Sequence, residues 1–173
     1  YGPNEAMQPM LRDVDLYLAV ALRLLGEDVA AFYPENEAPI AALLAYVDAE
    51  KPQNIILFGA KRSMDFSQFA VRGHYNKIKF GDEDWIPIGD WELSPEELDE
   101  WIDTYDTDYF GQYFQAMIWL GRTEFYLDSP KTLGSPLPVD HIQRQAVDAA
   151  LLHELAVLKE AETPLNEIER LLV

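Results

Sequence analysis

The chain has 173 residues, 49% of them hydrophobic and 12% aromatic, which is typical of a globular protein with a sizeable core rather than of a disordered segment. Its 31 acidic and 13 basic residues give a net charge of -18, which argues against a nucleic-acid partner and an anionic membrane surface, because both bind clustered Lys and Arg. It contains no cysteine, which excludes disulfides, thiolate metal sites and a cysteine nucleophile.

No apolar stretch approaches the roughly 18 to 20 residues that a membrane-spanning helix requires, so we expect no membrane insertion of this chain. The acidic composition leaves two interpretations open. It provides solubility, in a salty or extracellular setting, or it forms a surface for a cationic partner.

Two helices are predicted in the first 50 residues. Apolar residues recur at helical spacing from Met10 to Leu25, and Gly26 is suited to cap the end of that helix. The second helix is predicted from Pro39 to Glu50, because Pro fits the first turn. Its apolar face comprises Ile40, Leu43, Leu44 and Val47.

Residues 54–93 are predicted to form one long irregular loop. The apolar run Asn54 to Phe58 fits a buried strand or an extended segment laid over the core, and periodicity does not decide between them. From Gly59 to Gly89 no helical pattern is present, so this stretch is predicted to be a loop, with a hairpin as an option. Long loops in compact proteins often carry function.

Four further segments follow. Ser94 and Pro95 begin a helix that reaches about Tyr105, since Ser caps and Pro fits the first helical position. An aromatic helix begins near Asp106 or Asp108 and is predicted to be buried on most sides, with an apolar face of Phe110, Phe114, Met117 and Leu120.

After a turn region at 127–138, Asp140 is predicted to cap a helix that reaches Leu158, and Thr163 opens a final segment. The predicted fold is therefore mostly α, with about six helices packed around the loop 54–93 and a short strand or hairpin. Residues 1–173 form a single helical domain or a fragment of a larger helical protein.

Charged residues are unevenly distributed along the predicted loop and the segment that follows it. Five basic residues fall within 19 positions, and acidic residues then dominate up to Gly121; the basic residues are Lys61, Arg62, Arg72, Lys77 and Lys79. Either the two blocks are solvated faces or pair with each other, or they border a cleft that binds a carboxylate, a phosphate or a sulfated sugar.

Arg72-Gly73-His74-Tyr75 is the densest group of reactive side chains. Arg72 can clamp an anion, His74 titrates near neutral pH, and Tyr75 can donate a hydrogen bond, so these three are the candidate catalytic residues. A histidine in a loop is, however, more often structural than catalytic.

Three residues are candidates for binding. Trp85 lies among acidic residues, where a tryptophan either supports a sugar or anchors a loop on the core. Trp119 and Arg122 lie on the aromatic helix, and Arg122 is expected to be buried in an ion pair with Glu124 or a loop acid.

No cofactor is predicted. The three histidines lack zinc-ligand spacing. Calcium remains an option at Asp82 and Asp84, although the stretch does not match the EF-hand pattern.

Three motifs occur in an order that resembles the domain-of-unknown-function 3160 family of prokaryotic proteins. They are Asp65-Phe66-Ser67-Gln68-Phe69, Arg72-Gly73-His74-Tyr75, and the run from Tyr113 to Arg122 that reads YFQAMIWLGR. The short segment Ile56 to Gly59 also fits, so the resemblance extends over roughly residues 54–128, and over the flanking helices in character only.

Two departures affect what can be carried over. Ala70-Val71 stands where the family usually has a Pro before the Arg, and the acidic insert from Gly81 to Ser94 is longer than expected. The resemblance implies a parent protein of several hundred residues, often exported or lipid-anchored, and thus an extracytoplasmic or cell-surface location. It implies no activity, and the shared motifs fit a packing core better than a shared site.

The leading hypothesis is a non-catalytic interaction or scaffold portion of a larger protein. Tyr1 in place of an initiator Met and the amphipathic end at 170–173 are typical of a fragment. Its expected partners are the remainder of its parent polypeptide or other protein subunits, bound through apolar faces of the first and last helices. The alternatives are a hydrolase-like, glycan-directed enzyme around Arg72 and His74, and a calcium-stabilised binding module.

Overall fold

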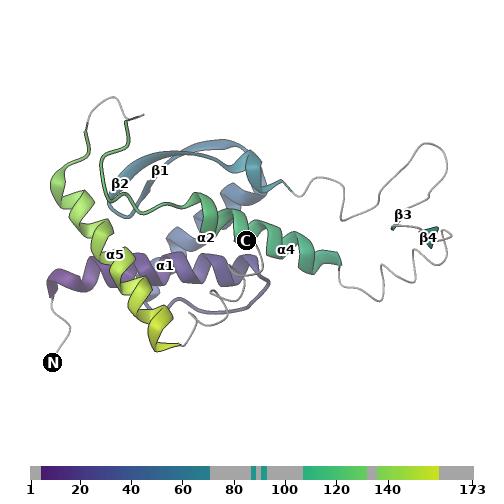
Figure 1. The fold of residues 1–173 in the computed structure, drawn as a ribbon, viewed down its shortest axis with the longest axis horizontal. Helices are drawn as coiled ribbons and strands as arrows, with labels where there is room; N and C mark the ends of the chain where they lie inside the picture. The colour runs from purple at the N-terminus through teal and green to yellow at the C-terminus, as the bar shows by residue number, and fades with distance from the viewer. Residues whose placement is uncertain (1–4, 71–86, 89–90, 93–106, 132–135, 160–173) are drawn as a thin grey trace.

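The computed structural model describes residues 5–70, 87–88, 91–92, 107–131 and 136–159. These residues are mostly helical, as predicted, and include four α-helices and an antiparallel β-hairpin (Figure 1). The helices are α1 (Gln8–Leu24), α2 (Glu37–Ala49), α4 (Thr107–Arg122) and α5 (Val139–Leu158), and the hairpin is β1 (Pro52–Leu57) with β2 (Ala60–Asp65). The short strands β3 (Pro87–Ile88) and β4 (Trp91–Glu92) also pair, and the 3-10 helices are η1 (Glu5–Met7), η2 (Pro34–Asn36) and η3 (Phe66–Phe69). The helices predicted at 94–105 and after Thr163 lie outside the described residues.

The end of α1 confirms the predicted glycine cap. Gly26 has a φ of +85°, a left-handed conformation that glycine adopts without strain. Its N–H donates to the Arg23 carbonyl and the N–H of Glu27 donates to the Leu22 carbonyl, both at 3.0 Å. This is a Schellman motif, which satisfies carbonyls that the end of a helix leaves without partners.

The hairpin confirms the option of a hairpin within the predicted loop 54–93, and it replaces irregular structure at residues 60–65. Strands β1 and β2 pair from Pro52 opposite Asp65 to Leu57 opposite Ala60, and β2 leads directly into η3. The turn residues Phe58 and Gly59 both have positive φ, as a two-residue hairpin turn of type I′ requires. Burial alternates along β2, but Arg62 occupies an inward position, and this charge hid the strand pattern in the sequence.

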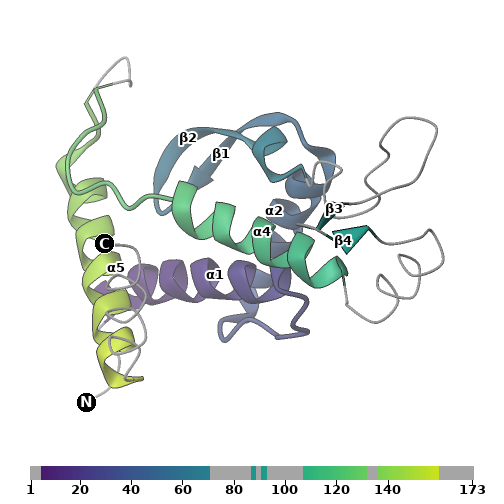
Figure 2. The same ribbon diagram turned by 45° about the vertical axis from the view of Figure 1, so that its right-hand side comes forward.

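One apolar core joins the helices to the hairpin. Figures 1 and 2 show α1 and α4 side by side, the hairpin on the side of α4 away from α1, and α5 crossing α1 steeply. The fully buried side chains at its centre come from α1, α2, η3 and α4; they include Val20, Ile40, Phe66, Phe69 and Trp119. No helix within the described ranges is long and apolar enough to cross a membrane.

Helix α4 turns a different face to the core from the one predicted. Ala116, Trp119 and Thr123 are buried, whereas Met117 and Leu120 from the predicted apolar face are exposed. The indole of Trp119 donates to the Tyr17 carbonyl of α1, so the face that carries Trp119 is the one turned to α1. Helix α4 is therefore not buried on most sides, contrary to the prediction.

Helix α5 also differs from its prediction. Pro138, not Asp140, is the N-cap residue, and no side chain caps this helix end. Leu155 and Leu158 of the predicted apolar stripe are exposed, whereas the fully buried side chains are the polar Gln145 and Asp148. Helix α5 thus packs on the rest of the molecule largely through polar groups.

Candidate functional site

Most of the residues proposed from the sequence lie outside the described part of the chain. This holds for the candidate catalytic residues and for the loop tryptophan and calcium candidates, namely Arg72, His74, Tyr75, Trp85, Asp82 and Asp84. The other two, Trp119 and Arg122, lie on α4 but do not come together. Trp119 is fully buried, and its indole Nε1 donates to the Tyr17 carbonyl at 3.0 Å, whereas Arg122 is exposed, contrary to its predicted burial.

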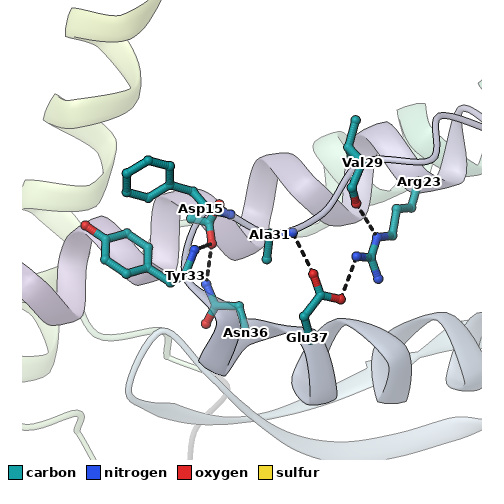
Figure 3. Close-up of polar contacts among 8 residues, drawn as sticks. Asp15, Arg23, Val29, Ala31, Tyr33, Asn36 and Glu37 are labelled. Atoms are coloured by element: carbon teal, nitrogen blue, oxygen red, sulfur yellow. Dashed lines mark hydrogen bonds and ion pairs between the residues drawn. The ribbon is translucent and has the colours of Figure 1, made fainter.

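Two groups of polar residues stand out instead, and the first holds the connection between α1 and α2 (Figure 3). The carboxylate of Asp15 on α1 accepts from the backbone N–H groups of Phe32 and Tyr33, at 2.9 and 3.1 Å. It also accepts from Nδ2 of Asn36 at 2.8 Å. One helical side chain therefore fixes two consecutive peptide groups of the loop and the residue that leads into α2.

A second carboxylate holds the same connection from the opposite helix. Glu37, in the first turn of α2, accepts from the Ala31 N–H and from Arg23, both at 2.6 Å, and Arg23 also donates to the Val29 carbonyl at 2.9 Å (Figure 3). The Ala31 N–H, followed by Arg23, lowers the pKa of Glu37 below its ordinary value, so this carboxylate stays ionised. We call residues 27–36, with these contacts, the pinned loop.

The pinned loop displays an aromatic side chain. Phe32 is 81% exposed, although its own N–H is bound by Asp15. Its ring meets the edge of the Tyr33 ring at 5.1 Å between centroids, and Arg12 lies 5.8 Å above the Tyr33 ring. The loop thus combines a fixed backbone with an apolar side chain in solvent.

The second polar group lies between α1, β2 and α5, and we call it the buried charge cluster. At its edge Arg144 on α5 forms a two-point ion pair with Asp13 on α1, with Nε to Oδ2 at 2.6 Å and Nη2 to Oδ1 at 2.8 Å. Such paired contacts are stronger and more directional than single ones. This ion pair joins the first and last helices of the described chain.

Arg62 on β2 reaches the same cluster from the hairpin. Its guanidinium donates to the Glu124 carbonyl and to Oε1 of Gln145, and it lies 4.1 Å above the Tyr126 ring. The Gln145 oxygen also accepts from the Tyr126 N–H at 2.8 Å. Burial lowers the pKa of Arg62, but an arginine starts so high that it remains charged.

Asp148 is the unusual member of the cluster. It is fully buried, and neither of its oxygens accepts a hydrogen bond from any described group. Burial, followed by the charge of Asp13, raises the pKa of Asp148 to about 8, while Arg144 and Arg62 oppose this rise. The carboxyl is therefore neutral at pH 7, and its proton can be donated to Asp13.

Sequence patterns missed most of this cluster, although one signal was present. Asp13 lies on the apolar face of α1, in line with Tyr17, Val20 and Leu24 at helical spacing. An acid at such a position needs a buried partner. On α5 one helical face carries Arg144, Gln145 and Asp148. In the sequence this polar face is typical of one that is exposed to solvent, because the residues that it contacts lie on distant segments.

The two groups differ in what they can do. The fully buried side chains of the charge cluster are closed to a substrate from solvent, so the cluster is suited to hold α5 in place. Among the described residues, no three His, Asp or Glu side chains are grouped to hold a metal ion. A ligand or partner in solvent can therefore reach the described residues only at the surface of the protein, which includes the pinned loop.

Comparison with protein families gives a match to the first part of the chain. The family described as "Protein of unknown function (DUF3160)" matches residues 1–80. The match spans less than half of the 173 residues and shows that residues 1–80 are similar to the DUF3160 family. The resemblance stated from the motifs is confirmed, and it includes α1, α2 and the hairpin in full rather than starting near residue 54.

The DUF3160 match contains the whole of the pinned-loop group and one side of the buried charge cluster. It includes the pinned loop, Asp13 and Arg62, and it ends before α4 and α5. The motif from Tyr113 to Arg122 therefore lies outside it. No curated protein and no solved structure is significantly similar to the chain.

Proposed function

We propose that this chain is a non-catalytic interaction portion of a larger protein, and that it binds another polypeptide segment through an apolar face on α1 and α4. The observation that carries the proposal is the exposure of apolar side chains on these two neighbouring helices. They are Leu18 and Leu22 on α1 with Tyr113, Met117 and Leu120 on α4, and we call them the α1–α4 face.

The contacts between the helices support treating these residues as one surface. The hydroxyl of Tyr17 donates to the Leu120 carbonyl at 3.2 Å, and the Cα of Gly26, further along the chain from α1, lies next to the side chain of Gln112. The two helices therefore run antiparallel, and each carries exposed apolar side chains. Apolar surface that is shared by two packed helices is typical of an interaction site.

The high net charge of the chain makes an exposed apolar face unexpected, which supports its assignment as a binding surface. With a net charge of -18 the protein is rich in side chains that would keep a surface polar, yet Met117 is 47% exposed. The occupant that we propose is a helix from another part of the same polypeptide, because the DUF3160 resemblance implies a longer parent chain. An amphipathic helix is the element that a two-helix surface accommodates best.

A labelling experiment tests the proposal. The chain has no cysteine, so Met117→Cys provides a unique thiol in the 173-residue protein. We expect rapid modification by a maleimide in the isolated chain and at least tenfold slower modification in the longer parent protein, measured on the peptide that contains residue 117.

Ile56→Cys is the matched control. Ile56 is an apolar residue of the hairpin that is 73% exposed and is not part of the α1–α4 face, so its labelling should be equally fast in both proteins. Equal labelling of residue 117 in the two proteins would refute the proposed function.

We further propose that this interaction takes place outside the cytoplasm or at the cell surface. The family resemblance supports this location, because members often carry export or lipoprotein signals. Fractionation of cells that produce the parent protein tests it, and recovery of the protein in the cytosol would contradict it.

A further inference from the structure

The pinned loop carries the most exposed large apolar side chain in the described part of the chain. Phe32 is 81% exposed, and its N–H is bound by Asp15, which is not a residue of the α1–α4 face. The phenyl group is not among the five side chains that define the α1–α4 face. An inference about it goes beyond the proposed function.

The backbone that presents this ring is held unusually well for a connection between helices. Side chains of α1 and α2 bind the carbonyl of Val29 and the N–H groups of Ala31, Phe32 and Tyr33. A connection of this kind normally retains conformational freedom that is lost on binding. Here that freedom is already restricted in the free protein, so an aromatic residue at its centre can bind with little further ordering.

The charged residues of the pinned loop are all acidic, and one of them, Glu35, pairs with Arg12 of α1 at 3.0 Å. Between Arg23 and Lys51 there is no basic residue and there are six acidic ones, of which Glu27, Asp28 and Glu35 are exposed residues of the pinned loop. An anionic membrane would be repelled by these carboxylates. A protein pocket lined by apolar side chains and bordered by Lys or Arg would complement both the ring and its surroundings.

We propose that Phe32 is an anchor residue that inserts into an apolar pocket of a protein partner, and that basic side chains at the rim of that pocket pair with the acidic residues of the pinned loop. Buried aromatic anchors of this kind dominate the binding energy of many protein interfaces. The preorganised backbone supplies the geometry, and the carboxylates supply the preference for a basic partner.

Photo-crosslinking in cells that produce the parent protein identifies the partner. Phe32 is replaced with p-benzoylphenylalanine, and Ile56, which is also exposed, is replaced in a parallel control. We expect a discrete protein adduct from position 32 that is absent from position 56, and crosslinked peptides that map to an apolar pocket with Lys or Arg at its rim. A lipid adduct, no adduct, or a pocket without basic residues would overturn the proposal.

Binding of the purified parent protein to the identified partner then provides the quantitative test. Phe32→Ala should weaken binding by about 30-fold or more, as expected of an anchor residue. Glu27→Lys with Asp28→Lys should weaken it by at least about tenfold, with the loss shrinking at high salt. An affinity unchanged by Phe32→Ala, or a charge-reversed variant that binds as well as the parent, would overturn the proposal.

The two proposals fail independently. Met117→Lys alters the α1–α4 face and should leave partner binding at Phe32 unchanged, whereas Phe32→Ala should leave the labelling of residue 117 unchanged. Because Phe32 is mostly in solvent, its replacement with Ala should also leave the urea midpoint unchanged, so a loss of binding cannot be attributed to unfolding.

Discussion

The neutral carboxyl of Asp148 predicts an unusual dependence of stability on pH. Below its ordinary pKa of 3.8 the group is protonated in both the folded and the unfolded chain. Between that value and about 8 the unfolded chain releases the proton and the folded chain retains it. The free energy of unfolding therefore falls by about 1.4 kcal/mol per pH unit across this window and levels off above it.

The substitution Asp148→Asn isolates this effect. The Asn amide can donate to Asp13 as the protonated carboxyl does, and it does not titrate. We expect the free energy of unfolding of D148N, minus that of the parent protein, to rise by about 2 to 3 kcal/mol from pH 5.5 to 8.5. This is slightly less than the full slope implies, because water that reaches the ionised carboxylate screens part of its charge.

Urea unfolding, followed by circular dichroism at half-unit steps of pH, measures this difference. The window starts at pH 5.5 because ordinary carboxylates have finished titrating there. Asp140→Asn is the control, since it removes an exposed carboxylate from the same helix. A difference between D148N and the parent that stays constant within about 0.5 kcal/mol over the window would refute the assignment of a buried, protonated Asp148.

Three further predictions concern the rest of the fold. Gly59→Ala should destabilise the protein by about 1 to 2 kcal/mol in urea unfolding, because φ is +75° there and the added Cβ would lie 3.1 Å from Nη1 of Arg144. Trp119→Leu should cost about 3 kcal/mol in the same assay, because it leaves a cavity in the core and the Tyr17 carbonyl without its donor. Asp15→Ala should free the pinned loop, with at least tenfold faster hydrogen exchange at the amide of Phe32, measured by NMR.

Each of these predictions has a distinct contrary result. Gly121→Ala adds a methyl group on α4 where no atom lies within 4 Å, so a loss equal to that of Gly59→Ala would exclude the proposed crowding at the hairpin turn. A Trp119→Leu variant of full stability would show that the indole is not at the centre of the core. Unchanged exchange at Phe32 in Asp15→Ala would show that the carboxylate does not hold the loop.

The sequence was a good guide where a segment contacts the core through apolar side chains alone. The spacing in α1 and α2 predicted both helices to within a few residues, and Gly26 predicted the end of α1. In β2 the inward-facing Arg62 interrupts the apolar alternation, so the sequence offers a hairpin there only as an option within a loop. A charged residue that is buried with partners from distant segments has no signature in its own neighbourhood.

The candidate sites were harder to predict for the same reason. Asp148 and Gln145 lie on the most polar face of α5, and only the presence of Asp13 and Arg62 makes that face the buried one. Phe32 presents the opposite case, because an apolar residue in a connection is usually expected to cover the core. Its exposure depends on the hydrogen bonds of Asp15, which the sequence does not reveal.

The ion pair between Asp13 and Arg144 also constrains how the protein is made. The two residues are 131 positions apart, so at 5 to 20 residues per second a ribosome needs about 7 to 26 s to add Arg144 after Asp13. During that time α1, α2 and the hairpin can assemble, but Asp13 on the apolar face of α1 has no guanidinium from α5. Among the described elements α5 is the last to be synthesised, and until it docks the nascent protein exposes the surface that this helix later covers.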